Sequence, residues 1–460
     1  MIIILIAGML IPNQAFSITV KQEEELSHEF MKYILKHAEL IEDPLIVNYV
    51  NNVGQRIVSV VPPQPFTYHF YIIKNDVYNA FASPAGHIFI NSGLFEAMDN
   101  EEELAGILGH EIAHVVCRHI SQKIERSKKI GLATLAGIAA GIFLGTGGAA
   151  AGAGAITIGS MAAGQSIALA YSREDEMQAD QLGLKYLTNA GYRGFGLLSA
   201  LKKIRTRQWF GSKQIPTYLT THPAVEDRIV YISSWLENNT KPKTRTSAKA
   251  RYDFAIAHTK LIAMYGDERT ALRKFQIYID KHPENHIAHY GYALILARTG
   301  NRKDAIAHLK TALEKKAFDL NILRDLGRIY FLDGLYPEAL NSLKGAAGIA
   351  PDDPETLFFI GRTQLELGKL NEAVSTFEKL IAKNPDYTQA LYFLGNVYGK
   401  LEKLEEAHYF LGIYYKNKED YKNALFHLNR ALKKTVDPDK KSKIKELLKE
   451  IRKSSMELRD

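Results

Sequence analysis

Small residues recur every 34 positions through the second half of this 460-residue chain, and this spacing constrains the fold more than any other feature. Three series share the period: Gly266, Gly300, Gly334 and Gly368; Ala271, Ala305, Ala339, Ala373 and Ala407; and Gly327, Gly361 and Gly395. Chance does not keep one period over several independent series, so the chain is expected to contain tandem copies of one structural unit. The copies run over residues 250–435.

A period of 34 residues is that of the tetratricopeptide repeat, in which small residues lie where two antiparallel helices cross. We therefore predict an all-α solenoid over residues 250–435. At its end the spacing halves, since Gly395 and Gly412 are 17 residues apart, as are Ala407 and Ala424. One helix there is expected to serve two half-repeats. Residues 436–460 are rich in Lys and Glu and predict a charged C-terminal helix.

The composition is that of an ordinary globular protein, with 46% hydrophobic and 24% charged residues. It excludes a disordered chain and a polytopic membrane protein. The one cysteine, Cys117, excludes an intramolecular disulfide and any zinc site that needs two cysteines. The formal charge of +7 has no single basic stripe behind it, so we expect no nucleic acid partner.

The N-terminus resembles a secretory leader. Residues 2–11 are apolar over the length of a signal-peptide core, and Ala15-Phe16-Ser17 offers small residues for cleavage. Nothing basic precedes Lys21, which leaves a buried N-terminal strand as the alternative. We interpret residues 1–17 as a signal peptide, which predicts a periplasmic location, with association to a membrane as a further possibility.

Residues 22–245 mix helix and strand. Residues 23–60 are predicted to be helical and residues 66–73 to form a strand, and residues 78–95 predict a hairpin with Pro84-Ala85-Gly86 as its turn. Within this block, residues 130–172 carry no charge and are rich in Gly and Ala. They predict a helical hairpin or lid that packs over the domain or makes peripheral contact with a membrane. Membrane insertion and a mobile loop are the alternatives.

Residues 110–114 read His-Glu-Ile-Ala-His, a pattern that can build a metal site on a helix. His110 and His114 stand at i and i+4, so both imidazoles project from one face and can bind one ion. Glu111 lies beside them, within reach of a water on that ion. Asn100 and Glu103 are the expected capping residues of this helix. The alternative is chance occurrence, because the pattern alone is only fairly specific.

A third ligand would come from the next acidic cluster. Glu176 and Asp180 stand at i and i+4 of a second predicted helix. Glu176 could complete a site with one open position for water, and Asp180 could accept a hydrogen bond from a liganding histidine. The alternative is a solvated, charged helix start. His119 is one position away from the third histidine of the extended metzincin pattern, and we interpret it as a surface histidine.

Together these motifs resemble the HtpX/CAAX-protease group of zinc metallopeptidases. The resemblance covers about residues 25–235. It includes residues 79–86 (Asn-Ala-Phe-Ala-Ser-Pro-Ala-Gly), residues 172–183 around the acidic cluster, and residues 221–223 (Thr-His-Pro) with Arg228 beyond them. Four motifs in order are far more specific than the pentapeptide alone. The attached repeats narrow the resemblance to the periplasmic type of this group that enhances β-barrel assembly.

The resemblance implies an α+β fold, with a mainly helical gluzincin-type metallopeptidase domain that contains a small β-sheet. It implies one Zn²⁺ per chain, with Glu111 as the general base and Asp180 as the partner of a ligand. The implied zinc ligands are His110, His114 and Glu176.

The resemblance also matches two residues whose roles it leaves open. His222 could approach the zinc and close the site as a gating ligand, or it could cap a helix. Arg228, placed with the catalytic residues, would either help to bind an oxyanion or brace the site by salt bridges.

We therefore expect a zinc-dependent endopeptidase that hydrolyses unfolded or misassembled envelope proteins, with clients docked on the repeats. The outer-membrane β-barrel assembly machinery is a further expected partner. An extended substrate could add to an edge strand by backbone hydrogen bonds. The residues expected in that strand are Asn79, Ala80, Phe81 and Ala82.

Two other functions stay open. One is a chaperone or scaffold that acts through the repeats and carries a latent or gated protease site, although the intact Glu111 argues against a dead enzyme. The other is a membrane-embedded processing protease, which depends on insertion of residues 130–172.

Overall fold

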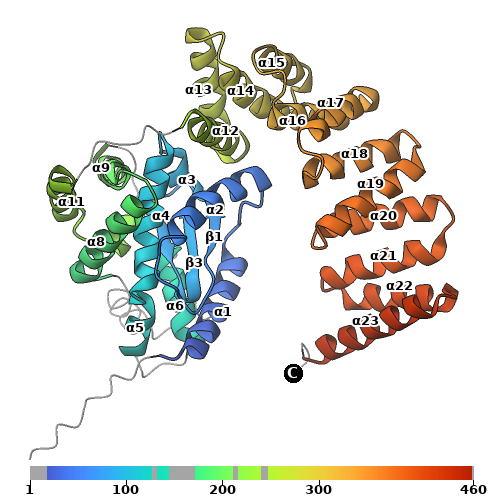
Figure 1. Cartoon of the computed structure of the whole chain (residues 1–460), viewed down its shortest axis with the longest axis horizontal. Helices are drawn as coiled ribbons and strands as arrows, with labels where there is room; N and C mark the ends of the chain where they lie inside the picture. The colour runs from blue at the N-terminus through green and yellow to red at the C-terminus, as the bar shows by residue number, and fades with distance from the viewer. Residues whose placement is uncertain (1–17, 127–131, 145–170, 211–215, 240–246, 458–460) are drawn as a thin grey trace, which may run out of the picture. The chain divides into compact units, whose positions relative to one another are not determined.

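The computed structural model describes residues 18–126, 132–144, 171–210, 216–239 and 247–457. Contacts divide the chain into two compact units, Met1–Asp267 and Glu268–Asp460 (Figure 1). The predicted signal peptide, residues 1–17, lies outside the described residues. The domain limits proposed from the sequence stay predictions. The helix of residues 248–265 packs with helices of the first unit.

The first unit is mainly helical with one small sheet. Its elements are α1 (Val20–His37), α2 (Pro44–Val58), β1 (His69–Ile73), β2 (Ala80–Ala82), the 3-10 turn η1 (Pro84–Gly86), β3 (His87–Asn91), α3 (Ser92–Glu96), α4 (Glu101–Val116), α5 (His119–Arg126), α6 (Leu132–Phe143), α8 (Arg173–Asn189), α9 (Phe195–Phe210), α10 (Thr217–Thr221), α11 (Val225–Asn239) and α12 (Ala248–Tyr265).

The sheet has the strand order β1-β3-β2, with β1 parallel and β2 antiparallel to β3. The predicted hairpin is confirmed, and η1 forms its turn because Ala85 and Gly86 both take positive φ values, 58° and 88°. A side chain at Gly86 would lie 2.4 Å from the backbone oxygen of Thr67, so this position needs glycine for space as well. The helix predicted over residues 23–60 is two helices, because Pro44 starts α2 and Asp43 caps it.

The uncharged segment is described only in part, because residues 145–170 lie outside the described residues. Its first helix, α6, packs against α1 and buries Phe143, whose ring stacks on Phe81 of β2 with centroids 5.2 Å apart. This part therefore packs on the first unit, and the prediction of a hairpin or lid over residues 130–172 stays a prediction. Within the described residues no helix is both long and apolar enough to span a membrane.

The second unit consists of helices in antiparallel pairs. They are α13 (Glu268–Lys281), α14 (His286–Arg298), α15 (Arg302–Lys315), α16 (Leu320–Leu332), α17 (Tyr336–Ile349), α18 (Pro354–Glu366), α19 (Leu370–Lys383), α20 (Thr388–Lys400), α21 (Leu404–Asn417), α22 (Tyr421–Lys434) and α23 (Pro438–Glu457). The predicted solenoid is confirmed.

Glycine lets the paired helices approach at equivalent places. In each case a glycine faces a bulky side chain sixteen residues later, and a Cβ there would lie 2.5 to 2.8 Å from it. These pairs are Gly327–Leu343, Gly361–Phe377, Gly395–Leu411 and Gly412–Leu428. Because Gly412 lies on α21, this helix closes the pair with α20 and opens the pair with α22. The predicted half-repeat is confirmed.

Replacing Gly361 with Ala should destabilise the repeat unit by about 1–3 kcal/mol, since the new methyl would overlap the Phe377 ring. The matched control is Gly348→Ala, because a Cβ at Gly348 meets no atom within 4 Å and alanine favours helix. Urea unfolding followed by circular dichroism measures both. Equal stability of the two variants would contradict this account of the repeat.

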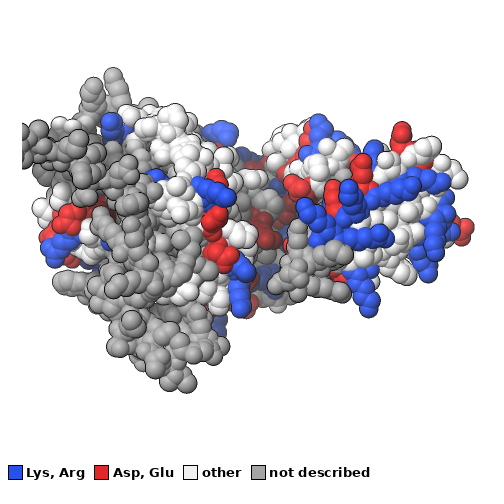
Figure 2. All heavy atoms as spheres, turned by 90° about the horizontal axis from the view of Figure 1, so that it is seen from below, with Lys and Arg blue, Asp and Glu red and all other residues white. Residues whose placement is uncertain are grey.

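The charged C-terminal helix α23 buries Ile444, Leu448 and Ile451 against α22, and most of its lysines are exposed. It therefore covers the apolar end of the array. Lys and Arg side chains gather on the face of the repeat unit seen in Figure 2, so the basic excess is more localised than the sequence alone indicated.

Candidate metal centre

Helix α4 carries the His-Glu-x-x-His pattern through the core of the first unit. Asn100 caps it by accepting a hydrogen bond from the backbone N–H of Glu103 (3.2 Å). The Glu103 carboxylate accepts from the backbone of Asp99 (2.9 Å). The whole of the helix around His110, Glu111 and His114 is buried, and the three side chains are at most 2% exposed.

Helix α8 lies against α4 because glycines meet at their contact. A Cβ on Gly183 would be 3.1 Å from the backbone oxygen of Gly109, the residue before His110. Ser172 and Asp175 form a capping box that fixes where α8 begins. The close approach puts Glu176 and Asp180, both fully buried, beside the histidines of α4.

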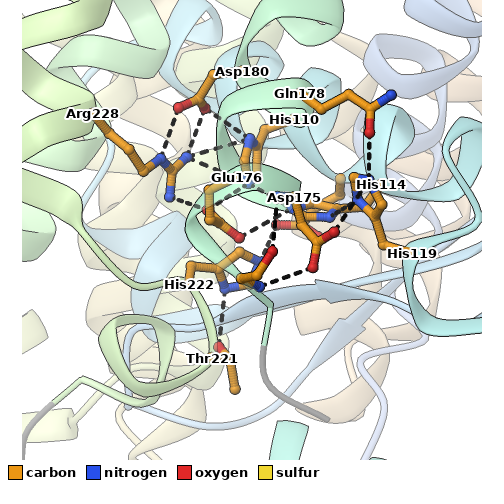
Figure 3. Close-up of polar contacts among 12 residues, drawn as sticks. His110, His114, His119, Asp175, Glu176, Gln178, Asp180, Thr221, His222 and Arg228 are labelled. Atoms are coloured by element: carbon orange, nitrogen blue, oxygen red, sulfur yellow. Dashed lines mark hydrogen bonds and ion pairs between the residues drawn. The ribbon is translucent and has the colours of Figure 1, made fainter. Parts of the chain in front are cut away.

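Four ligand-type side chains converge in this space (Figure 3). Atoms of His110, His114, Glu176 and His222 all lie within 4.8 Å of one another. The Nε2 atoms of His110 and His114 are 3.0 Å apart, and each lies 3.4 Å from a Glu176 carboxylate oxygen. The structure thus brings the three predicted ligands together and adds the predicted gating histidine.

Asp180 and Arg228 form a layer behind this cluster. An Asp180 oxygen lies 2.9 Å from His110 Nδ1, as expected for the hydrogen bond that orients this ring. Arg228 of α11 donates to both Asp180 oxygens at 2.7 and 2.8 Å and also pairs with Glu176. Its side chain is 4% exposed, so the guanidinium is committed to the two carboxylates. This arrangement favours bracing over oxyanion binding for Arg228.

His119 is buried, and its interpretation as a surface histidine is wrong. The left-handed backbone of Arg118 (φ 54°) ends α4 and redirects the chain, so helical spacing past Val116 does not apply. His119 Nδ1 then lies 2.8 Å from His114 Nδ1, and its Nε2 lies 3.0 Å from Gln178 Oε1. With Gln178 accepting from Nε2–H, His119 accepts from His114, whose Nε2 is left free to bind an ion.

Two tyrosines that sequence reasoning missed stack on the histidines. The Tyr171 ring lies 3.7 Å from that of His114, and the Tyr218 ring lies 4.1 Å from that of His222. Both hydroxyls are buried without a hydrogen-bond partner among the described residues. His222 is further held by Thr221, whose Oγ1 lies 2.9 Å from Nδ1, and its Nε2 lies 3.4 Å from Glu111.

The electrostatics of the cluster favour a cation. Burial would raise the pKa of the Glu176 carboxyl, but Arg228, His222 and the hydrogen bonds from His110 and His114 hold it well below its usual range. Burial and His110 lower the pKa of His114, which keeps this ring neutral as a ligand must be.

His110 behaves in the opposite way. Burial and Arg228 lower the pKa of His110, but hydrogen bonds to Asp180 and Glu176 outweigh them and raise it to about 9. Both carboxylate oxygens of Glu111 are also buried without a hydrogen bond among the described residues. The donor set of imidazoles and carboxylate fits zinc.

The predicted substrate strand lies at one edge of the sheet. In β2 the backbone groups of Asn79, Phe81 and Ser83 form the hydrogen bonds to β3. The backbone N–H and C=O groups of Ala80 and Ala82 therefore point away from β3. All four predicted side chains are buried, and the Asn79 amide donates to the backbone oxygen of Phe143 on α6.

Comparison with known proteins agrees with this architecture. Residues 47–236 match the model of peptidase family M48, and residues 266–319, 298–354, 330–387 and 360–421 match tetratricopeptide-repeat models. Among solved structures, YrrB, "a TPR protein with an unusual peptide-binding site", is 22% identical with a TM-score of 0.33. The match covers 38% of this chain and 89% of that one.

The chain is similar to curated proteases along most of its length. The beta-barrel assembly-enhancing protease of Yersinia pestis is 29% identical over 73% of this chain and 66% of its own length. That of Escherichia coli (strain K12) is 28% identical over 72% and 67%. The mitochondrial metalloendopeptidase OMA1 of Schizosaccharomyces pombe is 26% identical over 41% and 52%. The chain thus spans about two thirds of the length of the first two relatives.

The predicted resemblance and fold class are confirmed. The chain joins a domain that matches peptidase family M48, over residues 47–236, to tetratricopeptide repeats.

Proposed function

We propose that the chain is a zinc-dependent endopeptidase that hydrolyses unfolded or misassembled envelope proteins and docks them through its repeats. The observation that carries this proposal is the buried cluster of His110, His114 and Glu176, beside which the buried carboxylate of Glu111 makes no hydrogen bond within the described residues. The names of the relatives support a role in β-barrel assembly. We further propose that the chain acts in the periplasm and that the assembly machinery is a partner of its repeats. Casein cleavage with and without a chelator tests the peptidase.

In the proposed reaction, His110, His114 and Glu176 hold one Zn²⁺. When bound, the ion supplies a Lewis acid that polarises the scissile carbonyl and activates water. Glu111 takes the proton of the attacking water and delivers it to the leaving amine, which is general acid–base catalysis by one carboxylate. Asp180 fixes the ring of His110, and Arg228 holds Asp180 and Glu176 in place.

We propose that substrates bind as an added strand. The backbone groups of Ala80 and Ala82 that point away from β3 can pair with an extended peptide. Such pairing reads the backbone, so cleavage would depend on local unfolding of the client more than on its sequence. Pairing requires that the contact of Asn79 with Phe143 opens, which makes α6 part of the proposed cover of the site.

His222 is proposed as the gate of the site. His222 belongs to the buried cluster of possible ligands, so with zinc bound its imidazole would compete with the attacking water for the ion. His222→Ala should raise casein cleavage about threefold or more, because the closed population is removed. The exposed His37 on α1 offers the control His37→Ala. Wild-type activity in His222→Ala would remove the gate and leave the peptidase intact.

His119 is proposed as a positioning residue for His114. Removing its acceptor in His119→Ala should weaken zinc binding about 10- to 100-fold, since His114 loses the partner that fixes its tautomer. His119→Asn places an amide oxygen near the position of Nδ1 and should restore most of the affinity. Competition with a chromophoric chelator measures zinc affinity directly. Equal loss in both variants would show that His119 only fills space.

A further inference from the structure

Arg362 lies among four aromatic rings of the repeat unit. It belongs to α18 and is half-buried. Its guanidinium carbon lies 4.5 Å from the ring centre of Phe331 and 4.8 Å from that of Phe393. The rings of Phe358 and Phe359 are 5.7 and 5.8 Å away. These rings come from α16, α18 and α20, the first helices of three successive pairs, which contact one another.

The other arginines of this helix layer are neutralised by acids. Arg328 stands one repeat before Arg362 and lies 3.2 Å from Asp325. Arg324 pairs with Asp353 and Glu355 at 3.3 Å. Among the described residues, by contrast, Arg362 has no acid within ion-pair distance and no hydrogen bond. Its close contacts are aromatic, and Glu366 on the same helix acts on its charge from beyond ion-pair distance. Burial accordingly lowers the pKa of Arg362, whereas Asp325 raises that of Arg328 despite burial.

The donors of Arg362 remain available to a ligand. Aromatic rings attract a guanidinium without using its N–H groups. The contacts therefore hold the planar fork of N–H donors in place and leave these donors unpaired. None of its nitrogens is among the fully buried polar atoms without a partner, so they can reach solvent. A fork held in this way has little rotational freedom left to lose when an acceptor binds.

We propose that Arg362 and its aromatic rings bind a carboxylate of an extended client peptide. A planar guanidinium matches a carboxylate with two parallel hydrogen bonds, and one cation matches the charge of one carboxylate. The partly exposed rings of Phe359 and Phe393 offer apolar contact to the neighbouring side chain of the peptide. This inference deepens the docking part of the proposed function and rests on it. It is independent of hydrolysis.

The test measures peptide binding to the full chain carrying Glu111→Gln, which prevents cleavage. The probe is a fluorescein-labelled Gly/Ser peptide that ends in Val-Leu with a free carboxylate, followed by fluorescence anisotropy. The same peptide with a C-terminal amide should bind about tenfold more weakly or worse. A third peptide, with a C-terminal amide and a Glu beside the Leu, offers only a side-chain carboxylate. Its binding would show that Arg362 accepts a glutamate side chain as well as a C-terminal carboxylate.

The variants address the fork itself. Arg362→Gln should weaken binding of the free-acid peptide about tenfold or more, and Arg362→Lys should weaken it less because it keeps the charge. The matched control is Arg430→Gln, since Arg430 lies 4.6 Å over the single ring of Phe426 and is exposed. Circular dichroism verifies that each variant is folded.

Equal binding of the acid and both amide peptides, or no binding of any of them, would overturn the proposal. So would unchanged affinity in folded Arg362→Gln. If Arg362→Gln does not fold, the comparison of the three peptides on the chain that keeps Arg362 still tests whether a carboxylate is required for binding. Casein cleavage by the wild-type chain is measured separately, so a failure of docking is distinguished from a failure of the peptidase.

Discussion

Glu111→Gln should lower the rate of casein cleavage by about 10³-fold or more, while zinc content and folding stay unchanged. The amide keeps the size of the carboxylate but cannot take a proton, and general-base catalysis alone is worth about 10²- to 10⁴-fold. Neither oxygen of Glu111 makes a hydrogen bond within the described residues, and its ion-pair contact is with His222 Nε2 at 3.4 Å, so the isosteric amide should leave the fold intact. A fluorescent casein assay and zinc analysis of the same sample measure both quantities.

The control for this variant is Glu174→Gln, which removes an exposed carboxylate from the start of α8 and should leave the rate at the wild-type value. Cleavage by Glu111→Gln at the wild-type rate would refute the proposed mechanism. It would favour a scaffold whose metal site has a structural role.

Arg228→Met should lower the free energy of unfolding of the first unit by about 3–5 kcal/mol. The arginine side chain is 4% exposed and holds the fully buried carboxylates of Glu176 and Asp180. Without it, two buried negative charges lose their counter-ion, and breaking a buried ion pair from one side costs about this much. The loss should be largest in chelated protein, since an ion at the centre would otherwise offset part of the charge.

Tryptophan fluorescence suits this measurement, because both tryptophans of the chain, Trp209 and Trp235, belong to the first unit. Urea unfolding followed at these residues therefore reports on the peptidase domain. Arg205→Met is the matched control, since it breaks a surface pair with Glu226 and should cost at most about 1 kcal/mol. An equally small loss in Arg228→Met would show that the arginine does not brace the site.

The repeats were predictable because their signal is local and multiplied. Each copy places a small residue at the same helix crossing, so the 34-residue period stays detectable even where one copy has a different residue. The halved spacing at Gly412 identified α21 as shared between two pairs for the same reason. The break between α1 and α2 was missed, although Asp43-Pro44 is a helix-start signal that the apolar periodicity obscured.

The residues of the metal centre could be predicted from the sequence only where two of them lie one helical turn apart on the same helix. His110 with His114, and Glu176 with Asp180, lie four residues apart on one helix each, so their shared faces could be derived. That the two helices meet came from the resemblance, and its physical cause is the contact of Gly109 with Gly183.

His119, Tyr171 and Tyr218 could not be found in this way. His119 reaches His114 through a left-handed turn at Arg118, which no periodicity encodes. The tyrosines come from other parts of the chain, and an isolated tyrosine in a sequence carries no sign that it will stack on a histidine.

The central claim is that this chain hydrolyses peptide bonds with one zinc ion held by α4 and α8. The most direct test is casein cleavage by the purified full chain, before and after chelation, and during stepwise return of zinc. The account predicts that chelation abolishes cleavage and that activity returns in full at one zinc ion per chain. Undiminished cleavage by the zinc-free protein would contradict it.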